Sequence, residues 1–162
     1  DSKQLEKLCA RIKKNKKNKK YDCVIGVSGG VDSTYTAYLV KRKLKLNPLA
    51  VHFDNGWNSE LAISNIEKVV TKCNFEYNTL IVDWDEFREL QVAYLKASVV
   101  DIEVATDHAI IATMFKLAKK YNIKYILSGG NIATETGMPY AWTWPKKDLT
   151  NLKNIHKKFF KN

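Results

Sequence analysis

The sequence predicts a three-layer α/β/α sandwich, in which a mainly parallel sheet carries helices on both faces. Two observations lead to this fold class. Short apolar runs typical of buried parallel strands recur along the chain, over 22–27, 49–54, 78–82 and 124–128. Segments with apolar residues at helical spacing separate these runs, and this alternation indicates right-handed crossovers between parallel strands. With 162 residues, 45% of them hydrophobic, the chain is long enough to bury the core of one globular domain.

The first half of the chain alternates between helices and strands. Apolar residues at helical spacing predict a helix over 5–12, which the lysine-rich run 13–20 ends. The strand 22–27 leads into a helix over 32–44, and Asn47-Pro48 separates that helix from the strand 49–54. Asn55-Gly56 marks a turn, and a third helix is expected from about Ser59 to Cys73.

Two further helices lie between the last two strands. Apolar spacing predicts them over 85–99 and 106–122, and either Thr106 or Asp107 is expected to be the N-cap residue of the second. The strand 124–128 then runs into a second pair of glycines. The remainder is expected to be irregular over 138–145 and then to form a basic amphipathic helix.

The positive charge of the chain is concentrated in one place. The formal net charge is +10, and the run 13–20 carries six lysines, so the rest of the chain carries +4. No aromatic residue interleaves with these lysines to stack on a base. A solvated linker is therefore the preferred interpretation of the run, and a nucleic-acid partner is not expected.

Cysteine usage argues against a metal cluster and favours a reducing compartment, because Cys9, Cys23 and Cys73 form no C-x-x-C pair. The longest apolar stretch is well short of the roughly 18 residues that span a bilayer, and no signal peptide precedes the first strand. We therefore expect a cytoplasmic protein with no membrane partner. Because the chain begins at Asp1, we expect it to be a piece of a longer protein.

Ligands of parallel α/β sheets bind beyond the carboxyl ends of the strands, which selects three loops: 28–33, 54–58 and 128–131. In the first loop, Gly29 and Gly30 let the backbone turn tightly after a buried strand. They also let an anion approach the peptide N–H groups at the start of the next helix. Ser28 and Ser33 add hydroxyl donors, and Asp32 is placed to hold a magnesium ion that bridges to a phosphate. An ordinary strand-to-helix turn, with Asp32 as a capping residue, is the alternative.

The hexapeptide from Ser28 to Ser33 resembles the S-G-G-x-D-S signature of the PP-loop, or N-type, ATP pyrophosphatases. The spacings of the Walker A and dinucleotide-binding glycine motifs are absent from the sequence. The resemblance implies the adenine nucleotide alpha-hydrolase-like, or HUP-type, fold. Enzymes of this superfamily cleave ATP between the α and β phosphates and adenylate a carbonyl oxygen, after which a nitrogen or sulfur nucleophile displaces AMP.

Within this superfamily, three co-linear segments, 50–69, 103–135 and 142–159, resemble the N-acetyl sugar amidotransferases of bacterial surface-polysaccharide and flagellin-sugar biosynthesis. The resemblance implies that the acetamido group of a nucleotide-linked N-acetyl sugar becomes an acetamidino group. It also implies ATP and Mg²⁺ as cofactors and a glutaminase partner that supplies ammonia. Members of that family are longer, so we expect the central part of one: a helix and linker over 1–20, a PP-loop ATP-binding domain over 21–140, and an aromatic loop and basic helix over 141–162.

The resemblance implies roles for individual residues. The pyrophosphate end of ATP would be held by Ser28, Gly29, Gly30, Asp32 and Ser33. Asp32 and Ser33 would be catalytic, and Asp32 would be the magnesium ligand. The adenosine would lie beside the first two strands and the second glycine loop, at Val27, His52, Phe53, Asp54, Gly129 and Gly130. Core packing is the alternative role for His52 and Phe53.

Several candidates keep two interpretations. Asp107, as a catalytic residue, and His108 are candidates for contacting the sugar or positioning the attacking group, but a plain N-cap explains Asp107 equally well. Tyr140, Trp142 and Trp144 would either stack on the sugar or uracil or form a small satellite core. Asn131 and Glu135 are candidates for polar contacts or for stabilising their loop.

Three other functions compete with the sugar amidotransferase. A PP-loop enzyme that modifies tRNA would explain the basic run, but a thiolating enzyme needs reactive or paired cysteines. Free-standing synthetases that make NAD, GMP or a deazaguanine nitrile are expected to share only the hexapeptide with this chain. The third alternative is a nucleotide-binding module without turnover, against which the intact Asp32 and both serines argue.

Overall fold

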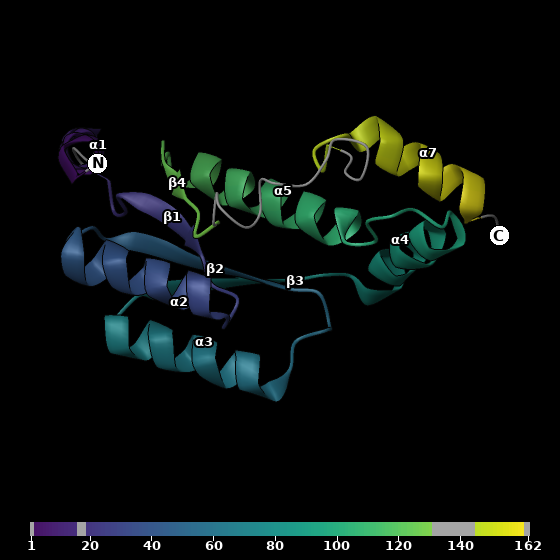
Figure 1. The fold of residues 1–162 in the computed structure, drawn as a ribbon, viewed down its shortest axis with the longest axis horizontal. Coiled ribbons are helices and arrows are strands. Elements are labelled where there is room, and N and C mark those ends of the chain that lie inside the picture. Colours follow the sequence, from purple (N-terminus) through teal and green to yellow (C-terminus); the bar gives the residue numbers. More distant parts are fainter. Residues whose placement is uncertain (1, 16–18, 131–144, 161–162) are drawn as a thin grey trace. The chain divides into compact units, whose positions relative to one another are not determined.

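The computed structural model describes residues 2–15, 19–130 and 145–160 (Figure 1). None of the described helices is both long and apolar enough to cross a membrane. The elements follow one another in this order: α1 (Ser2–Asn15), β1 (Cys23–Gly26), α2 (Val31–Tyr38), the π-helix η1 (Leu39–Lys43), β2 (Pro48–Asp54), α3 (Glu60–Cys73), β3 (Glu76–Ile81), α4 (Trp84–Lys96), α5 (Val104–Lys120), β4 (Ile126–Leu127) and α7 (Leu149–Phe159).

The four described strands form one sheet in the order β3-β2-β1-β4. The central strand β1 pairs in parallel with both neighbours, with Cys23 opposite Pro48 of β2 and Val24 opposite Ile126 of β4. Helices connect these parallel strands, so the predicted α/β class with a mainly parallel sheet is confirmed.

Different helices bury the two faces of the central strands, because side chains alternate between faces along a strand. On one face, Cys23, Ile25 and Ala50 lie in a cluster with Ala37 of α2 and Ile66 of α3. On the other face, the apolar cluster consists of Tyr21, Val24, Leu49, Val51, Met114, Leu117, Ala118 and Ile123. Figure 1 accordingly shows α2 and α3 on one side of the sheet and α5 on the other, which gives the three predicted layers.

The chain divides into two compact units, each with a core of its own. The first unit comprises Asp1–His52, Asn58–Leu80 and Met114–Gly130, and it contains both clusters described above. The second unit comprises Phe53–Trp57, Ile81–Thr113 and Asn131–Asn162. Its core is formed by Phe87, Tyr94, Val104, Ala105 and Leu152, where α4 packs against α7.

Three helices differ from the prediction. The helix α5 begins at Val104, so Thr106 and Asp107 lie inside it and the prediction that one of them is the N-cap residue was wrong. The chain turns earlier than expected because the Asp101 carboxylate accepts a hydrogen bond from the Glu103 N–H at 3.0 Å. The helix α1 is not stopped by the first lysines of the basic run, and it continues to Asn15. The predicted helix 32–44 changes from α to π geometry after Tyr38.

Candidate functional site

The loop between β1 and α2 is packed directly on the first turns of α3. Val27 still belongs to the sheet ladder, since its N–H donates to the Val51 carbonyl at 2.9 Å. Gly29 has a φ of +77°, and a Cβ there would lie 2.3 Å from the carbonyl oxygen of Ala62. Asn65 Nδ2 donates to the Gly29 carbonyl at 3.1 Å. Both the left-handed backbone and the close approach therefore require glycine at position 29.

The N-terminus of α2 opens onto this loop. Gly30 is its N-cap residue, and no side-chain hydrogen bond caps the helix there. The Ser33 hydroxyl instead bonds back into the loop, because it accepts from the Ser28 N–H at 3.2 Å and donates to the Gly30 carbonyl at 3.1 Å. The two serine hydroxyls lie 3.1 Å apart. A helix N-terminus without a side-chain cap, bordered by two hydroxyls, is suited to bind an anion such as a phosphate.

The second glycine loop, from Ser128 to Gly130, lies against the first turns of the same helix. A Cβ at Gly129 would lie 2.6 Å from Thr36 Oγ1 and 3.0 Å from the Asp32 carbonyl oxygen, so a larger residue would displace the loop. The Gly130 N–H donates to Ser128 Oγ at 3.1 Å and closes the turn. The structure therefore brings together the two glycine loops that the sequence singled out.

Asp32 is exposed in the first turn of α2. Across the described part of the chain, no group of three His, Cys, Asp or Glu residues is placed to hold a metal ion. Magnesium is commonly held by one or two carboxylates together with the phosphates of a substrate. One exposed carboxylate beside a helix N-terminus fits a magnesium ion of that kind, which would be bound with a nucleotide.

The residues at the end of β2 have partners of their own. His52 is 6% exposed, and its Nδ1 donates to the Val27 carbonyl at 2.9 Å, which ties the ends of β2 and β1 together. Phe53 packs edge to face on Phe87, with ring centroids 6.2 Å apart. Asp54 Oδ1 accepts from the Gly56 N–H at 3.0 Å. His52 is thus satisfied in the core, and the expected contacts of these residues with adenosine stay predictions.

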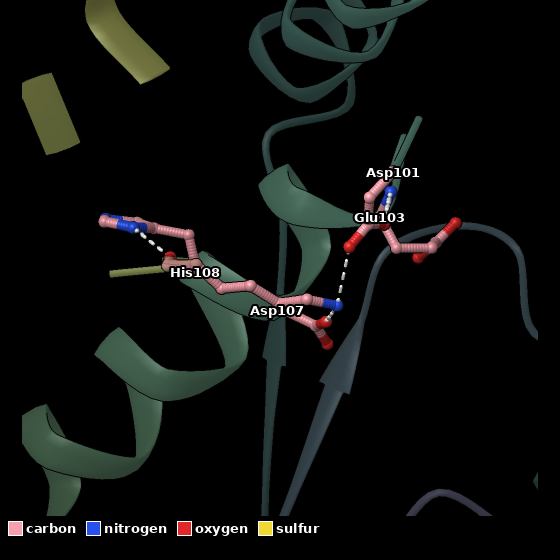
Figure 2. A network of polar contacts seen from close by, with 5 residues as sticks. Asp101, Glu103, Asp107 and His108 are labelled. Atoms are coloured by element: carbon pink, nitrogen blue, oxygen red, sulfur yellow. Dashed lines mark hydrogen bonds and ion pairs between the residues drawn. The ribbon is translucent and has the colours of Figure 1, made fainter. Parts of the chain in front are cut away.

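Asp107 belongs to a polar network within the second unit, which Figure 2 shows with Asp101 and His108. Lys146 Nζ pairs with the carboxylate of Asp107 and, at 3.1 Å, with that of Asp101. His108 Nδ1 donates to the backbone carbonyl of Lys146 at 2.9 Å. Burial disfavours the charged form of Lys146, but the hydrogen bonds to the two carboxylates outweigh it and raise the pKa of Lys146 above its ordinary value. Asp107 therefore binds a lysine rather than capping a helix, and a catalytic role for it stays a prediction.

Sequence reasoning missed Asn65 and a basic groove beside the hexapeptide. A pocket of about 610 Å³ lies between α2 and α3, and its lining includes Gly29, Arg42, Lys68 and Lys72. No local motif marks Asn65, because its partner Gly29 lies in a distant segment of the chain. The helical spacing of Lys68 and Lys72 was the available signal for a shared basic face. Five other candidates fall outside the described residues: Asn131, Glu135, Tyr140, Trp142 and Trp144.

Comparison with known structures supports the fold. The chain is similar to the NH3-dependent NAD synthetase of Campylobacter jejuni in complex with nitrate, with 22% identity, a TM-score of 0.57, and coverage of 82% of this chain and 58% of that one. It is also similar to the glutamine-dependent NAD+ synthetase of Acinetobacter baumannii in complex with ADP, with 19% identity and a TM-score of 0.61. That match covers 85% of this chain and 28% of the synthetase. The NMN synthetase of Francisella tularensis is similar with 18% identity and a TM-score of 0.60, over 82% of this chain and 56% of that one.

Comparison of sequences identifies the family. An uncharacterized protein of Methanocaldococcus jannaschii is 31% identical over 127 residues, and the match spans 78% of this chain but only 44% of that protein. The NAD synthase family profile matches residues 4–158. The expectation that NAD synthetases share only the hexapeptide with this chain is therefore wrong, whereas the predicted PP-loop superfamily is supported. The chain belongs to the NAD synthase family.

Proposed function

We propose that this chain is the ATP-handling domain of a PP-loop enzyme that activates a carbonyl oxygen with ATP and then introduces nitrogen from ammonia. One observation carries the proposal. The serine hydroxyls at positions 28 and 33 and the N-terminus of α2 meet in a loop whose sharp turn requires glycine at position 29. The match to the NAD synthase family supports the same class of reaction.

The residues of the loop would bind and orient the phosphates. The N–H groups of the first turn of α2 and the Ser28 hydroxyl would donate to phosphate oxygens, and the Ser33 hydroxyl would do so on leaving the Gly30 carbonyl. His52 would keep the end of β1 in place. Asp32 would hold magnesium, which supplies positive charge to neutralise the phosphate oxygens. No protein nucleophile is needed, so catalysis would consist of positioning and electrostatic stabilisation.

The finer proposal concerns the substrate, and it rests on the resemblance of three segments to the N-acetyl sugar amidotransferases. The acetamido oxygen of a nucleotide-linked sugar would attack the α-phosphorus of ATP, and the bond to the β-phosphate would break to release pyrophosphate. Ammonia would then add to the activated carbon, lose protons to solvent and expel AMP. The product would carry an acetamidino group.

Formation of NAD or a related amide is a second candidate function, and the NAD synthase family match favours it. In that case a carboxylate would be adenylated in place of an acetamido oxygen, and the remaining steps would be the same. The ammonia would come from a glutaminase. One similar structure is a glutamine-dependent NAD+ synthetase, and the chain covers 28% of it. The chain spans less than half of its curated relative, so further segments of the whole protein would contribute to either reaction.

The experiment is an assay of pyrophosphate and AMP release from ATP in the presence of ammonium and magnesium. The acceptors are a panel of nucleotide-linked N-acetyl sugars and the carboxylic-acid form of NAD. We expect equimolar pyrophosphate and AMP with an N-acetyl sugar, and loss of both in Asp32→Asn. The matched control is Glu60→Gln, which changes an exposed acid in the first turn of α3 and should retain activity.

Release with the acid form of NAD alone would replace the sugar proposal by the second candidate. ATP binding without any release would favour a nucleotide-binding module. Release that depends on tRNA would favour the tRNA-modifying alternative.

A further inference from the structure

The pocket between α2 and α3, called here the α2/α3 groove, lies within the first unit. Figure 1 shows the two helices side by side on one face of the sheet. The α2 side of the groove is formed by Val31, Thr34, Tyr38 and, from η1, Arg42. These residues recur every three or four positions and therefore lie on one stripe. From Val31 to Arg42 the stripe is about 16 Å long, or three helical turns.

The lining of the groove is largely apolar and open to solvent. Val31 is 79% exposed, although valine is usually buried, and Tyr38 is 44% exposed. On the α3 side, Val69 and Cys73, which also pack on the core of the first unit, line the groove. Tyr35 stacks beside Tyr38 with ring centroids 6.3 Å apart and extends the apolar surface. The pocket, of about 610 Å³, therefore offers exposed apolar surface that a partner could cover.

The charged residues described along the rim of the groove are all positive. Arg42, Lys68 and Lys72 line it, and none of its described lining residues is acidic. Arg42 Nη2 donates to the Lys72 carbonyl at 3.2 Å, which fixes the guanidinium at the end of the groove. An occupant with negative charge therefore gains from all three cations.

The positive charge of the groove argues against an occupant from the same chain or from a second copy of it. The helix α7 has an apolar stripe, but its last turn carries His156, Lys157 and Lys158, and α1 ends in Lys13 and Lys14. A second copy would bring a formal net charge of +10 to an already basic groove. Both would place like charges together, which opposes binding.

We propose that the α2/α3 groove docks an acidic amphipathic helix of a partner protein. The three-turn length of the α2 stripe matches that of a helix with apolar residues at i, i+3, i+4 and i+7. These residues would lie on Val31, Tyr38 and Val69, in the usual arrangement of a helix in a groove. Acidic residues beside that stripe would pair with Arg42, Lys68 and Lys72. Gly29 and Val31 of the hexapeptide line one end of the groove, but none of the three cations belongs to the hexapeptide, so substitutions of the cations test the docking separately from the proposed function.

The test is a selection from a phage library of helices of about 14 residues held in a fixed helical scaffold. The target is the full chain. Enriched helices are then measured by fluorescence anisotropy against the groove variant Lys68→Glu/Lys72→Glu. The matched control is Lys116→Glu/Lys119→Glu, which makes the same charge change at exposed positions of α5, on the other face of the sheet. Circular dichroism and ATP affinity should be unchanged in both variants.

We expect the enriched helices to combine acidic flanks with an apolar stripe. Their affinity should fall about tenfold or more in the groove variant and stay constant in the control. The proposal is overturned if no helix is enriched, if the enriched helices are basic, or if both variants bind them equally. An oligouridine that binds the chain and loses its affinity only in the groove variant would also overturn it, because the groove would then bind RNA.

Discussion

Replacing Gly29 with alanine tests the link between backbone geometry and the loop. At a φ of +77°, alanine costs about 1–2 kcal/mol relative to glycine. The new Cβ would also lie 2.3 Å from the Ala62 carbonyl oxygen, so the loop must move away from α3. That movement breaks the hydrogen bond from Asn65, which is worth about 1 kcal/mol. The total loss of unfolding free energy is about 2–3 kcal/mol, which lowers the melting temperature of a chain of this length by about 5–10 °C.

The control for this variant is Gly30→Ala. Gly30 has a φ of −77°, and the nearest atom to its Cβ would be Ser28 Oγ at 3.5 Å, so alanine fits without strain. Differential scanning calorimetry of both variants should show a loss for Gly30→Ala of less than about 1 kcal/mol. Equal losses for the two variants, or a Gly29→Ala protein as stable as the parent, would refute the reasoning.

Three further predictions concern single side chains. Asn65→Ala should weaken ATP binding, measured by calorimetric titration, because it frees the Gly29 carbonyl from α3. Iodoacetamide should label Cys73, which is 9% exposed, before Cys23, whose pKa is raised to about 12 by burial; equal rates by mass spectrometry would contradict this. The raised pKa of Lys146 means that its ion pairs stabilise the fold fully below the ordinary value of 10.5 and lose their effect as the pH rises through the raised value. Lys146→Met should therefore lower the melting temperature at neutral pH but make little difference in strongly alkaline buffer.

Local sequence patterns predicted the central part of the fold. The apolar run before the hexapeptide is β1, and the helix predicted from about Ser59 to Cys73 is α3, capped by the Ser59 hydroxyl that accepts from the Ala62 N–H at 3.2 Å. These elements follow from periodicity and from capping chemistry, both of which act within a few residues.

The remaining features depend on contacts between distant segments. Nothing near Asp107 in the sequence indicates that Lys146 will pair with it, and the N-cap prediction failed because a turn at Asp101 starts the helix earlier. In the same way, Gly129 is required by its contact with Thr36 in α2, which only the folded chain creates. The two glycine loops could be identified from the sequence. The side chains that contact them, Asn65 at Gly29 and Thr36 at Gly129, could not.

The central claim is that the loop from Ser28 to Ser33 binds the phosphates of ATP and that Asp32 holds the magnesium ion bound with them. The most direct measurement is calorimetric titration of the chain with a non-hydrolysable ATP analogue and magnesium, alongside Asp32→Asn and Glu60→Gln. We predict micromolar to millimolar affinity that falls at least about tenfold in Asp32→Asn, as expected for the loss of a carboxylate that holds the metal, and is unchanged in Glu60→Gln. No binding to the parent chain, or equal binding by all three proteins, would contradict the claim.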